Sequence, residues 1–130
     1  MVFKRTKMTL REVLTKVNTE KPNAFSDEYL TKVVNEVEAL VYDYLETPDV
    51  DRIFHVLPDD IDVELNIPDP YSAAYESYLK ARLDYANEEY ELYSNNQAQF
   101  NADFDAWKAF AMRHGQVDTS NLPTQIKNWW

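Results

Sequence analysis

The chain has 130 residues, enough for one domain that buries roughly two-thirds of its unfolded surface. It has no cysteine and a single glycine, Gly115, which excludes disulfides, thiolate zinc sites and glycine-rich nucleotide-binding loops and favours helices joined by ordinary loops. The net charge of −10 argues against a phosphate-binding surface, because residues 22–130 hold seven basic and 21 acidic side chains.

Residues 1–8 are predicted to form a loose leader outside the folded domain. They include Lys4, Arg5 and Lys7, but no apolar run follows as in a secretory signal peptide. Apolar runs are only a few residues long throughout the chain, so we expect no contact with a membrane.

Two helix starts are visible in the first third of the chain. Thr9 and Glu12 have the spacing of a capping box and are followed by apolar residues at helical spacing, which predicts a helix over about 9–18. Ser26 is a favourable N-cap, and the apolar stripe that follows it predicts a second helix over 27–45.

Residues 47–69 form a long connection that three prolines interrupt. Within it, residues 61–67 alternate between apolar and polar side chains, which is strand periodicity. A lone strand is not stable, so this segment either pairs with another chain or lies as an extended loop on the helices.

The same connection is strongly acidic. Its candidate functional carboxylates are Asp49, Asp51, Asp59, Asp60, Asp62 and Glu64. They lack the glycine and the spacing of an EF-hand loop, so a solvated acidic loop is favoured over a calcium site.

A third helix is predicted over about 70–86, with Asp69 as its N-cap and Pro70 at the first helical position. Its apolar residues cover about 200° of a helical wheel, whereas a surface helix of a monomer typically shows a stripe a little over 100° wide. The excess predicts two buried faces, one for its own core and one for a neighbour. Arg82 lies within this arc and would need a carboxylate partner if buried.

A fourth helix is predicted over about 88–113, and Gly115 ends it. Its apolar positions follow a heptad rhythm: Tyr90, Tyr93, Gln97, Phe100, Phe104, Trp107 and Ala111. The simplest interpretation is an antiparallel partner of the third helix. The predicted fold is therefore all-α, a small four-helix bundle over 9–115 with an acidic extended loop at 47–69.

The C-terminal tail, residues 116–130, is mostly polar but ends in two tryptophans. Its candidate anchoring residues are Leu122, Ile126, Trp129 and Trp130. Two exposed tryptophans are costly, so the tail either folds back on its own domain or docks into a partner protein, unless it is disordered.

Chemistry at a catalytic or metal centre is not predicted. His55 and His114 are the only histidines and do not form a spaced ligand cluster. No nucleophile–base pattern is present, so we expect no enzyme and no cofactor. Stacking of the aromatic residues on single-stranded nucleic acid would need a basic groove, which the third and fourth helices lack.

Several motifs resemble the head-tail adaptor (head-completion, connector) proteins of tailed phages and prophages. The resemblance covers residues 8–113 and is strongest over 67–110. The motifs are Met8–Val13, Pro68-Asp69-Pro70-Tyr71, Tyr78, Asp84–Glu89, Tyr93-Ser94-Asn95 and Phe100-Asn101. Glu88 stands where family members often have glycine, which leaves open whether the third and fourth helices are separated by a turn or nearly continuous.

This resemblance implies a structural virion protein made in the cytoplasm of a host bacterium. Its identical subunits, commonly twelve, would form a ring beneath the portal at the capsid vertex. The ring would extend the DNA channel without binding DNA specifically and would be a platform for a stopper or tail-completion protein. No reaction is involved.

Within that expectation, each candidate surface has a role. The subunit interface would comprise Tyr71, Tyr75, Tyr78, Arg82 and Tyr85. The acidic loop would face the channel, although it could be merely solvated, and either the tail or the 61–67 segment would contact the portal. The alternatives are a DNA-mimic inhibitor of a host nucleic-acid enzyme and another neck protein, a stopper or tail terminator, which would usually be strand-rich.

Overall fold

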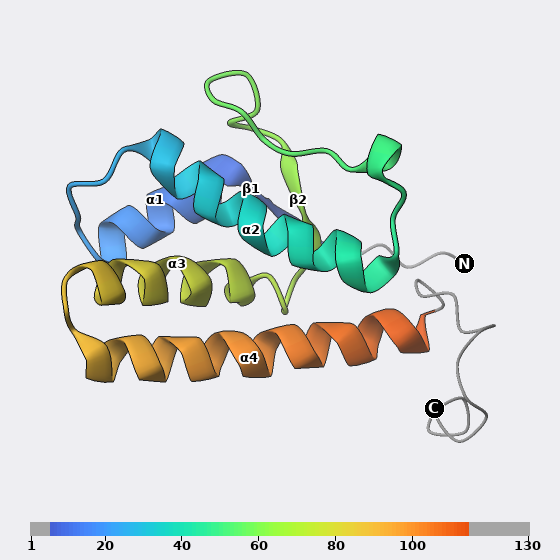
Figure 1. Cartoon of the computed structure of the whole chain (residues 1–130). Coiled ribbons are helices and arrows are strands. Elements are labelled where there is room, and N and C mark those ends of the chain that lie inside the picture. Colours follow the sequence, from blue (N-terminus) through green and yellow to red (C-terminus); the bar gives the residue numbers. More distant parts are fainter. Residues whose placement is uncertain (1–5, 115–130) are drawn as a thin grey trace.

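The computed structural model describes residues 6–114 and is mostly helical, with a small two-stranded sheet (Figure 1). In chain order the elements are β1 (Lys7–Thr9), α1 (Leu10–Glu20), α2 (Asp27–Leu45), the short 3-10 helix η1 (Asp49–Asp51), β2 (Glu64–Pro68), α3 (Ala73–Ala86) and α4 (Tyr90–Arg113). None of the helices in residues 6–114 is both long enough and apolar enough to cross a membrane.

The helices are arranged around α3, which lies between α4 on one side and the α1–α2 pair on the other (Figure 1). One core cluster joins all four helices and β2. The first two helices contribute the apolar faces that their spacing predicted, whereas α4 contributes only the later part of its predicted stripe, with Phe100, Trp107 and Ala111 buried. Its largest fully buried members include Tyr75, Leu10, Leu30, Leu65, Ile67, Leu79 and Leu83.

The start of α1 confirms the predicted capping box. The side chain of Thr9 accepts from the backbone N–H of Glu12, and the Glu12 carboxylate accepts from the N–H of Thr9 at 3.3 Å. The next two amides of the first turn, at Leu10 and Arg11, donate to carbonyls of the loop before β2 at 3.0 and 2.8 Å. The helix start is thus bonded to a segment some fifty positions later in the chain.

The sheet corrects two sequence predictions. Residues 7–9 are not a loose leader, because they form β1 and pair antiparallel with β2. The alternation over 61–67 predicted a strand correctly at Glu64–Pro68, but its partner is in the same chain and not in another molecule. The fold is therefore not purely α-helical.

The second helix has the predicted bounds, and the third and fourth begin later than predicted. Asp69 is not the N-cap of α3, because that helix starts three residues later than predicted and Ser72 occupies the N-cap position. The backbone N–H of Asp69 donates to the Thr6 carbonyl at 2.8 Å and so extends the sheet pairing. The following residues form a turn, and α3 starts at Ala73. Between α3 and α4, Glu88 adopts a left-handed conformation with φ of 59°, so the two helices are separated by a turn.

Candidate interaction surfaces

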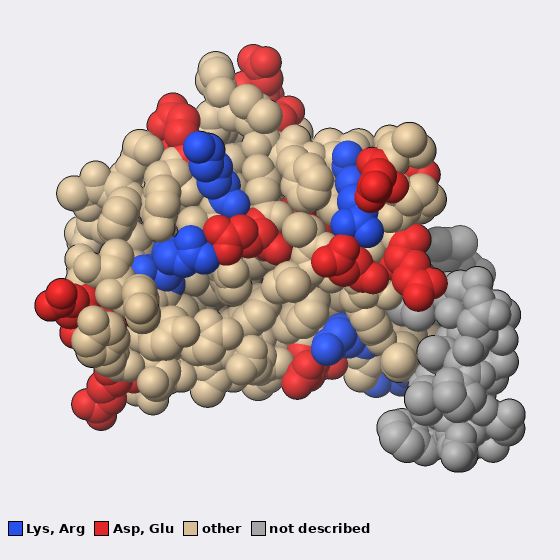
Figure 2. Space-filling view, in the orientation of Figure 1, with Lys and Arg blue, Asp and Glu red and all other residues tan. Residues whose placement is uncertain are grey.

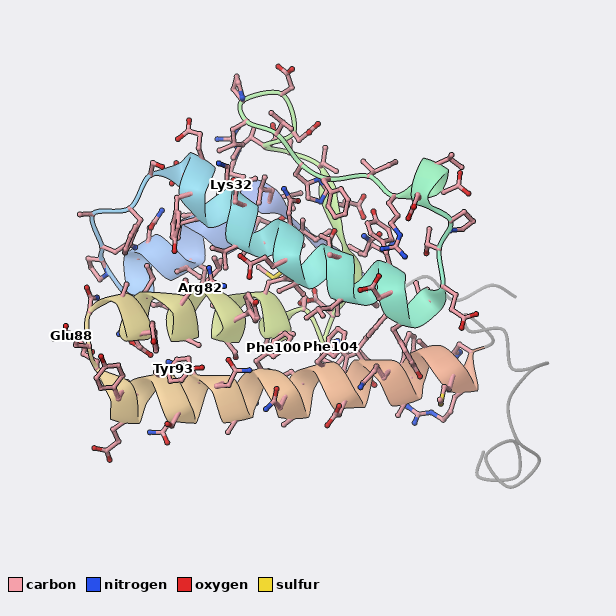
Figure 3. All side chains as sticks on the ribbon, viewed as in Figure 1. Lys32, Arg82, Glu88, Tyr93, Phe100 and Phe104 are labelled. Carbon is pink, nitrogen blue, oxygen red and sulfur yellow. The ribbon has the colours of Figure 1, made fainter. Side chains whose placement is uncertain are left out.

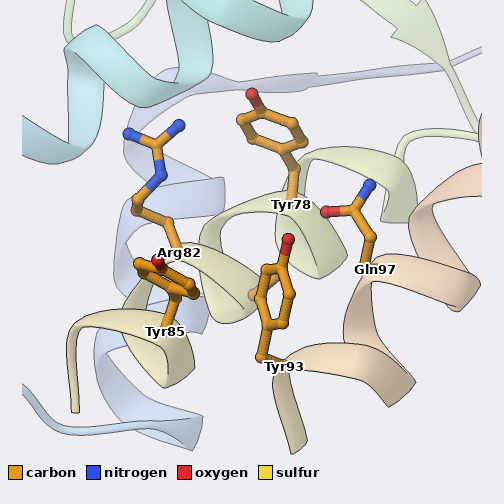
Figure 4. Close-up of a pocket in the computed structure, with 6 residues that line it drawn as sticks. Tyr78, Arg82, Tyr85, Tyr93 and Gln97 are labelled. Atoms are coloured by element: carbon orange, nitrogen blue, oxygen red, sulfur yellow. The ribbon is translucent and has the colours of Figure 1, made fainter. Parts of the chain in front are cut away.

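A hollow with a volume of about 360 Å³, here named the tyrosine hollow, lies between α3 and α4. Its lining residues are Tyr78, Ala81, Arg82 and Tyr85 of α3 and Tyr93 and Gln97 of α4. Figure 4 shows the three tyrosine rings and the Arg82 side chain around the opening. Aromatic rings that carry hydroxyl tips are typical of surfaces that bind other proteins.

The rim of the hollow near the α3–α4 turn is exposed and apolar. Tyr85 is 58% exposed and Tyr90 is 56% exposed. The Tyr85 ring packs edge-on against Tyr90 and Tyr93, with centroids 5.7 and 5.3 Å apart. Leu92, also exposed, lies in the same first turns of α4. These contacts fix the rings without covering them.

Arg82 has the carboxylate partner that its position in the apolar arc required. Its guanidinium donates to both oxygens of Glu36 on α2, at 2.6 and 3.2 Å, and the Tyr78 hydroxyl donates to the same carboxylate at 2.7 Å. Burial acts to raise the pKa of Glu36, but the hydrogen bonds from Arg82 and Tyr78 outweigh it, so this pKa lies below its ordinary value. The α2 side of the hollow is therefore fixed by the ion pair between Arg82 and Glu36.

Tyr75 does not belong to an exposed face, which corrects its assignment to the subunit interface. Its side chain is fully buried, and its hydroxyl donates to Glu38 and accepts from the backbone N–H of Ile67 at 2.9 Å. Burial and the neighbouring Glu38 carboxylate raise its pKa well above the ordinary value. Tyr71, from the same predicted set, is half-buried against Phe110, with ring centroids 5.3 Å apart.

The second surface is the segment Val50–Val56, here named the apolar segment. Val50 is 91% exposed, Ile53 65% and Val56 66%, and Phe54 is partly exposed as well. The sequence pattern predicted only an acidic loop in this region. Four apolar residues within seven positions of an otherwise acidic loop were the signal that could have indicated a binding surface.

Although its side chains are exposed, the backbone of the apolar segment is tightly held by α2. The Tyr42 hydroxyl bonds to both the N–H and the carbonyl of Ile53, at 3.2 and 2.8 Å. The Asn35 amide bonds to both backbone groups of His55, each at 2.9 Å. The His55 ring is buried, with Nε2 3.1 Å from Glu38.

Glu38 connects the apolar segment to α3 and β2. Its buried carboxylate contacts His55, Tyr75 and both the backbone and the side-chain amide of Asn66. The backbone amides of Asn66 and Ile67 in β2 are thereby bonded to side chains of the same molecule. Those two N–H groups are therefore not free to pair with an additional strand. This disfavours a portal contact in which the 61–67 segment joins a sheet of the portal.

The predicted acidic loop divides into parts with different environments. Asp49 and Asp51 lie in η1, and both are exposed. Asp60 accepts from the Val56 N–H at 2.7 Å and so closes the next turn, while Asp62 forms an ion pair with Arg11 at 2.8 Å. Asp59 and Glu64 are exposed, Glu64 at the start of β2.

Charge on the face drawn in Figure 2 is mixed, with acidic and basic side chains next to one another among larger uncharged areas. Residues 6–114 contain no group of three or more histidine, aspartate or glutamate side chains that could hold a metal ion. The predicted portal-docking residues Leu122, Ile126, Trp129 and Trp130 lie outside the described residues.

Comparisons of the chain with protein-family models, with curated proteins and with solved structures gave no match. The expectation of a head-tail adaptor therefore rests on the sequence motifs alone.

Proposed function

We propose that the chain is a structural head-tail adaptor of a tailed phage, without enzymatic activity, that assembles into a ring beneath the portal. One observation carries the proposal: a well-packed helical body presents two separate exposed apolar surfaces, the tyrosine hollow and the apolar segment. Apolar surfaces of this kind on a small protein mark sites of protein association. Tyr78, Arg82 and Tyr85 of the predicted interface line the hollow.

A ring of identical subunits fits this arrangement. In a head-to-tail contact each copy uses two different surfaces, and the contact closes into a ring when the rotation between copies permits it. A twofold dimer would require only one self-complementary surface. Two unlike surfaces on one body therefore support a ring, for which the family resemblance suggests twelve subunits.

The exposed carboxylates of the acidic loop would then line or rim the DNA channel. Asp59 and Glu64 are exposed, and Asp49 and Asp51 are exposed in η1. DNA affinity rises with each cation that a surface presents, so carboxylates let the DNA pass without adhering. Asp60 and Asp62 take part as charged neighbours, although each also has a bond within the subunit.

The test of the proposal is binding to the portal protein encoded in the same genome. The protein mixed with purified portal should yield a larger assembly by native mass spectrometry, with rings visible at one end of the portal by negative-stain imaging. Deleting residues 117–130 should abolish the complex if the C-terminal tail is the anchor. A genome without a portal gene, or a portal that never binds the intact chain, would refute the proposal.

The DNA-mimic and stopper alternatives gain no support from a specific observation. A DNA mimic needs a continuous acidic face, and on the face in Figure 2 acidic side chains alternate with basic ones. Stopper and tail-terminator proteins are usually strand-rich, whereas the described residues hold only a short two-stranded sheet.

A further inference from the structure

We propose that the basic leader of one copy docks into the tyrosine hollow of the next copy. The basic leader is here defined as Phe3, Lys4 and Arg5, which lie outside the described residues. This contact presupposes the proposed self-assembly and names the segment that fills the hollow. It is carried by the acidic charge at the rim, the aromatic lining of the hollow and the place where the described part of the chain begins.

The rim of the hollow at the α3–α4 turn is acidic. The stretch 83–107, which includes this turn, has six acidic side chains and no basic one. Glu88 and Glu91 are both exposed, and neither takes part in an ion pair in the part of the chain that the structure describes. Figure 3 shows Glu88 at the turn, with Tyr93 on the adjoining part of α4. Exposed carboxylates beside aromatic rings favour a partner segment that brings cations to the rim.

Two cations of the same molecule near the hollow are already paired. Lys21 forms an ion pair with buried Asp84 and lies 3.6 Å from Glu89. Arg82, at the α2 side of the hollow, donates to both oxygens of Glu36. Filling the hollow therefore buries no unpaired cation, and the charge at the rim stays negative.

The basic leader matches both the rim and the lining. It joins an aromatic ring to two cations, and no acidic residue precedes Glu12 in the chain. The hollow, with a volume of about 360 Å³ and walls of tyrosine rings, has space for one aromatic side chain. In the proposed contact Phe3 packs among these rings, as aromatic side chains do in pairs. Lys4 and Arg5 then face the rim carboxylates.

Other apolar parts of the chain match the rim less well. The apolar segment contains Asp51, and its arginine, Arg52, pairs with Asp43 and lies 3.6 Å from Asp49. It would therefore meet an acidic rim without a free cation. The tail 116–130 has one acidic and one basic side chain, so it brings no net charge to the rim.

The basic leader cannot reach the rim of its own hollow. The described part of the chain begins at Thr6, whose carbonyl accepts from the Asp69 N–H at 2.8 Å shortly before α3. The rim lies at the other end of α3, a helix of 14 residues that is about 21 Å long (Figure 1). Phe3 is three residues before Thr6, a separation of at most about 11 Å. The leader of one copy therefore enters the hollow of another, which is a head-to-tail contact.

The decisive experiment exchanges the charges of the two sides. The leader variant carries Lys4→Glu and Arg5→Glu, and the rim variant carries Glu88→Lys and Glu91→Lys. The two rim positions are exposed, so the substitutions do not disturb the core. Circular dichroism establishes that each variant is folded.

Association is measured by titration of unlabelled into ¹⁵N-labelled protein up to about 1 mM, where a contact with a millimolar Kd is still populated. The wild type should show concentration-dependent shifts at Tyr85 and Tyr93. Each variant alone should associate at least about tenfold more weakly, because like charges then meet at the rim. The 1:1 mixture should recover the shifts, because each leader then finds a rim of opposite charge.

The matched control carries Asp59→Lys and Glu64→Lys. Both positions are exposed and distant in sequence from the α3–α4 turn, and the net charge changes by the same amount as in the rim variant. This control should associate like the wild type, which separates a local effect at the rim from an effect of net charge.

A second readout uses the absence of cysteine in the chain. Copies with Val2→Cys and copies with Tyr90→Cys should crosslink to each other through a short bismaleimide, in solution or on the portal. Neither should crosslink efficiently to itself. If the wild type shows no shifts in solution, the crosslink on the portal alone decides.

A mixture that fails to recover the shifts of the wild type overturns the inference, as does the absence of a mixed crosslink both in solution and on the portal. Wild-type shifts at Ile53 and Val56 in place of Tyr85 and Tyr93 also overturn it, because the leader would then contact the apolar segment. If the leader variant still forms rings on the portal, the inference fails and the adaptor function stands. Recovery in the mixture without any portal binding would mean the reverse.

Discussion

The two ends of the α3–α4 hairpin are built from the same residue types but differ in what covers them. Near the end of α4, Trp107 is 2% exposed and packs edge-on against Tyr44 of α2, with centroids 5.7 Å apart. Near the α3–α4 turn, Tyr85 and Tyr90 contact each other and remain more than half exposed. Figure 3 shows Phe100 and Phe104 pointing from α4 toward the body, and Glu88 at the turn.

The difference lies in which groups of α1 and α2 reach each end. At the buried end α2 supplies an aromatic side chain. At the turn the neighbouring segment supplies Lys21, which pairs with buried Asp84 and lies 3.6 Å from Glu89. An ion pair fixes the position of the turn without covering the tyrosines. Aromatic spacing therefore defines a helix face, and the neighbouring elements decide how much of that face remains free for a partner.

The largest expected effect contrasts the two ends directly. Trp107→Ala should lower the free energy of unfolding by about 3–5 kcal/mol, since it leaves a large cavity in the core. Tyr90→Ala should lower it by less than about 1 kcal/mol, because its ring is mostly in water. Urea denaturation followed by circular dichroism measures both. Equal losses would mean that the turn end is packed as firmly as the core.

Two tyrosine–glutamate pairs between α3 and α2 sharpen the comparison. Tyr75→Phe should cost about 1–3 kcal/mol, because buried Glu38 and the N–H of Ile67 each lose a partner. Tyr78→Phe removes a bond to part-exposed Glu36 and should cost under about 0.5 kcal/mol, since water replaces the hydroxyl. Both substitutions remove only the tyrosine hydroxyl, so the two variants lose the same side-chain volume. A larger loss of stability for Tyr78→Phe than for Tyr75→Phe would contradict the greater burial assigned to the Tyr75 hydroxyl.

The Arg82–Glu36 bond predicts a pH dependence at the exposed end. Because the pKa of Glu36 is lowered in the folded state, its contribution is fully present above its ordinary value of 4.5 and is lost as the pH falls through the folded pKa. Glu36→Gln should reduce the loss of stability that the wild type shows below pH 4.5, by less than about 1 kcal/mol, because the pair is partly screened by water. Unfolding of both proteins across this range measures the slope, and parallel curves would refute the contribution.

A small gain in stability is expected at the turn itself. Glu88→Gly should raise the free energy of unfolding by roughly 0.5 kcal/mol, because glycine adopts the left-handed conformation without steric cost but loses more entropy on folding. Glu88→Val should lower it by about 1–2 kcal/mol for the opposite steric reason. Thermal unfolding of the two variants beside the wild type is the measurement, and a stabilising valine would exclude this account.

Local patterns in the sequence predicted helices well because spacing and capping act over a few residues. The apolar stripe of α2 is buried at Leu30, Val33 and Val37, and the Thr9–Glu12 box is formed. The partner of β2 could not be predicted, since the three residues of β1 have no strand pattern of their own. The later start of α3 depends on a bond from Asp69 to Thr6 that only the folded chain contains.

The candidate site was predicted in part. The wide apolar arc on α3 was predicted to provide one face for its own core and one for a neighbour, but α1 and α2 on one side and α4 on the other already pack against α3 within the same chain. The arc also did not distinguish Tyr75, which is buried, from Tyr85, which is exposed. That distinction depends on Glu38 of α2 reaching Tyr75, a contact between residues far apart in sequence. The apolar segment was overlooked because the acidic residues on both sides of it dominated the composition of the loop.

The pairing of β1 with β2 also constrains how the protein can be made. Residues 10–63 separate the two strands, so during synthesis the amides of Leu10 and Arg11 have no carbonyl acceptors until the chain beyond Val63 has left the ribosome. The first turn of α1 therefore cannot complete its hydrogen bonds early in synthesis. Its docking onto the segment before β2 must follow closure of the loop formed by residues 10–63. A chain whose translation halts before β2 would lack the carbonyl partners of these two amides, although α2 would already be present to pack against α1.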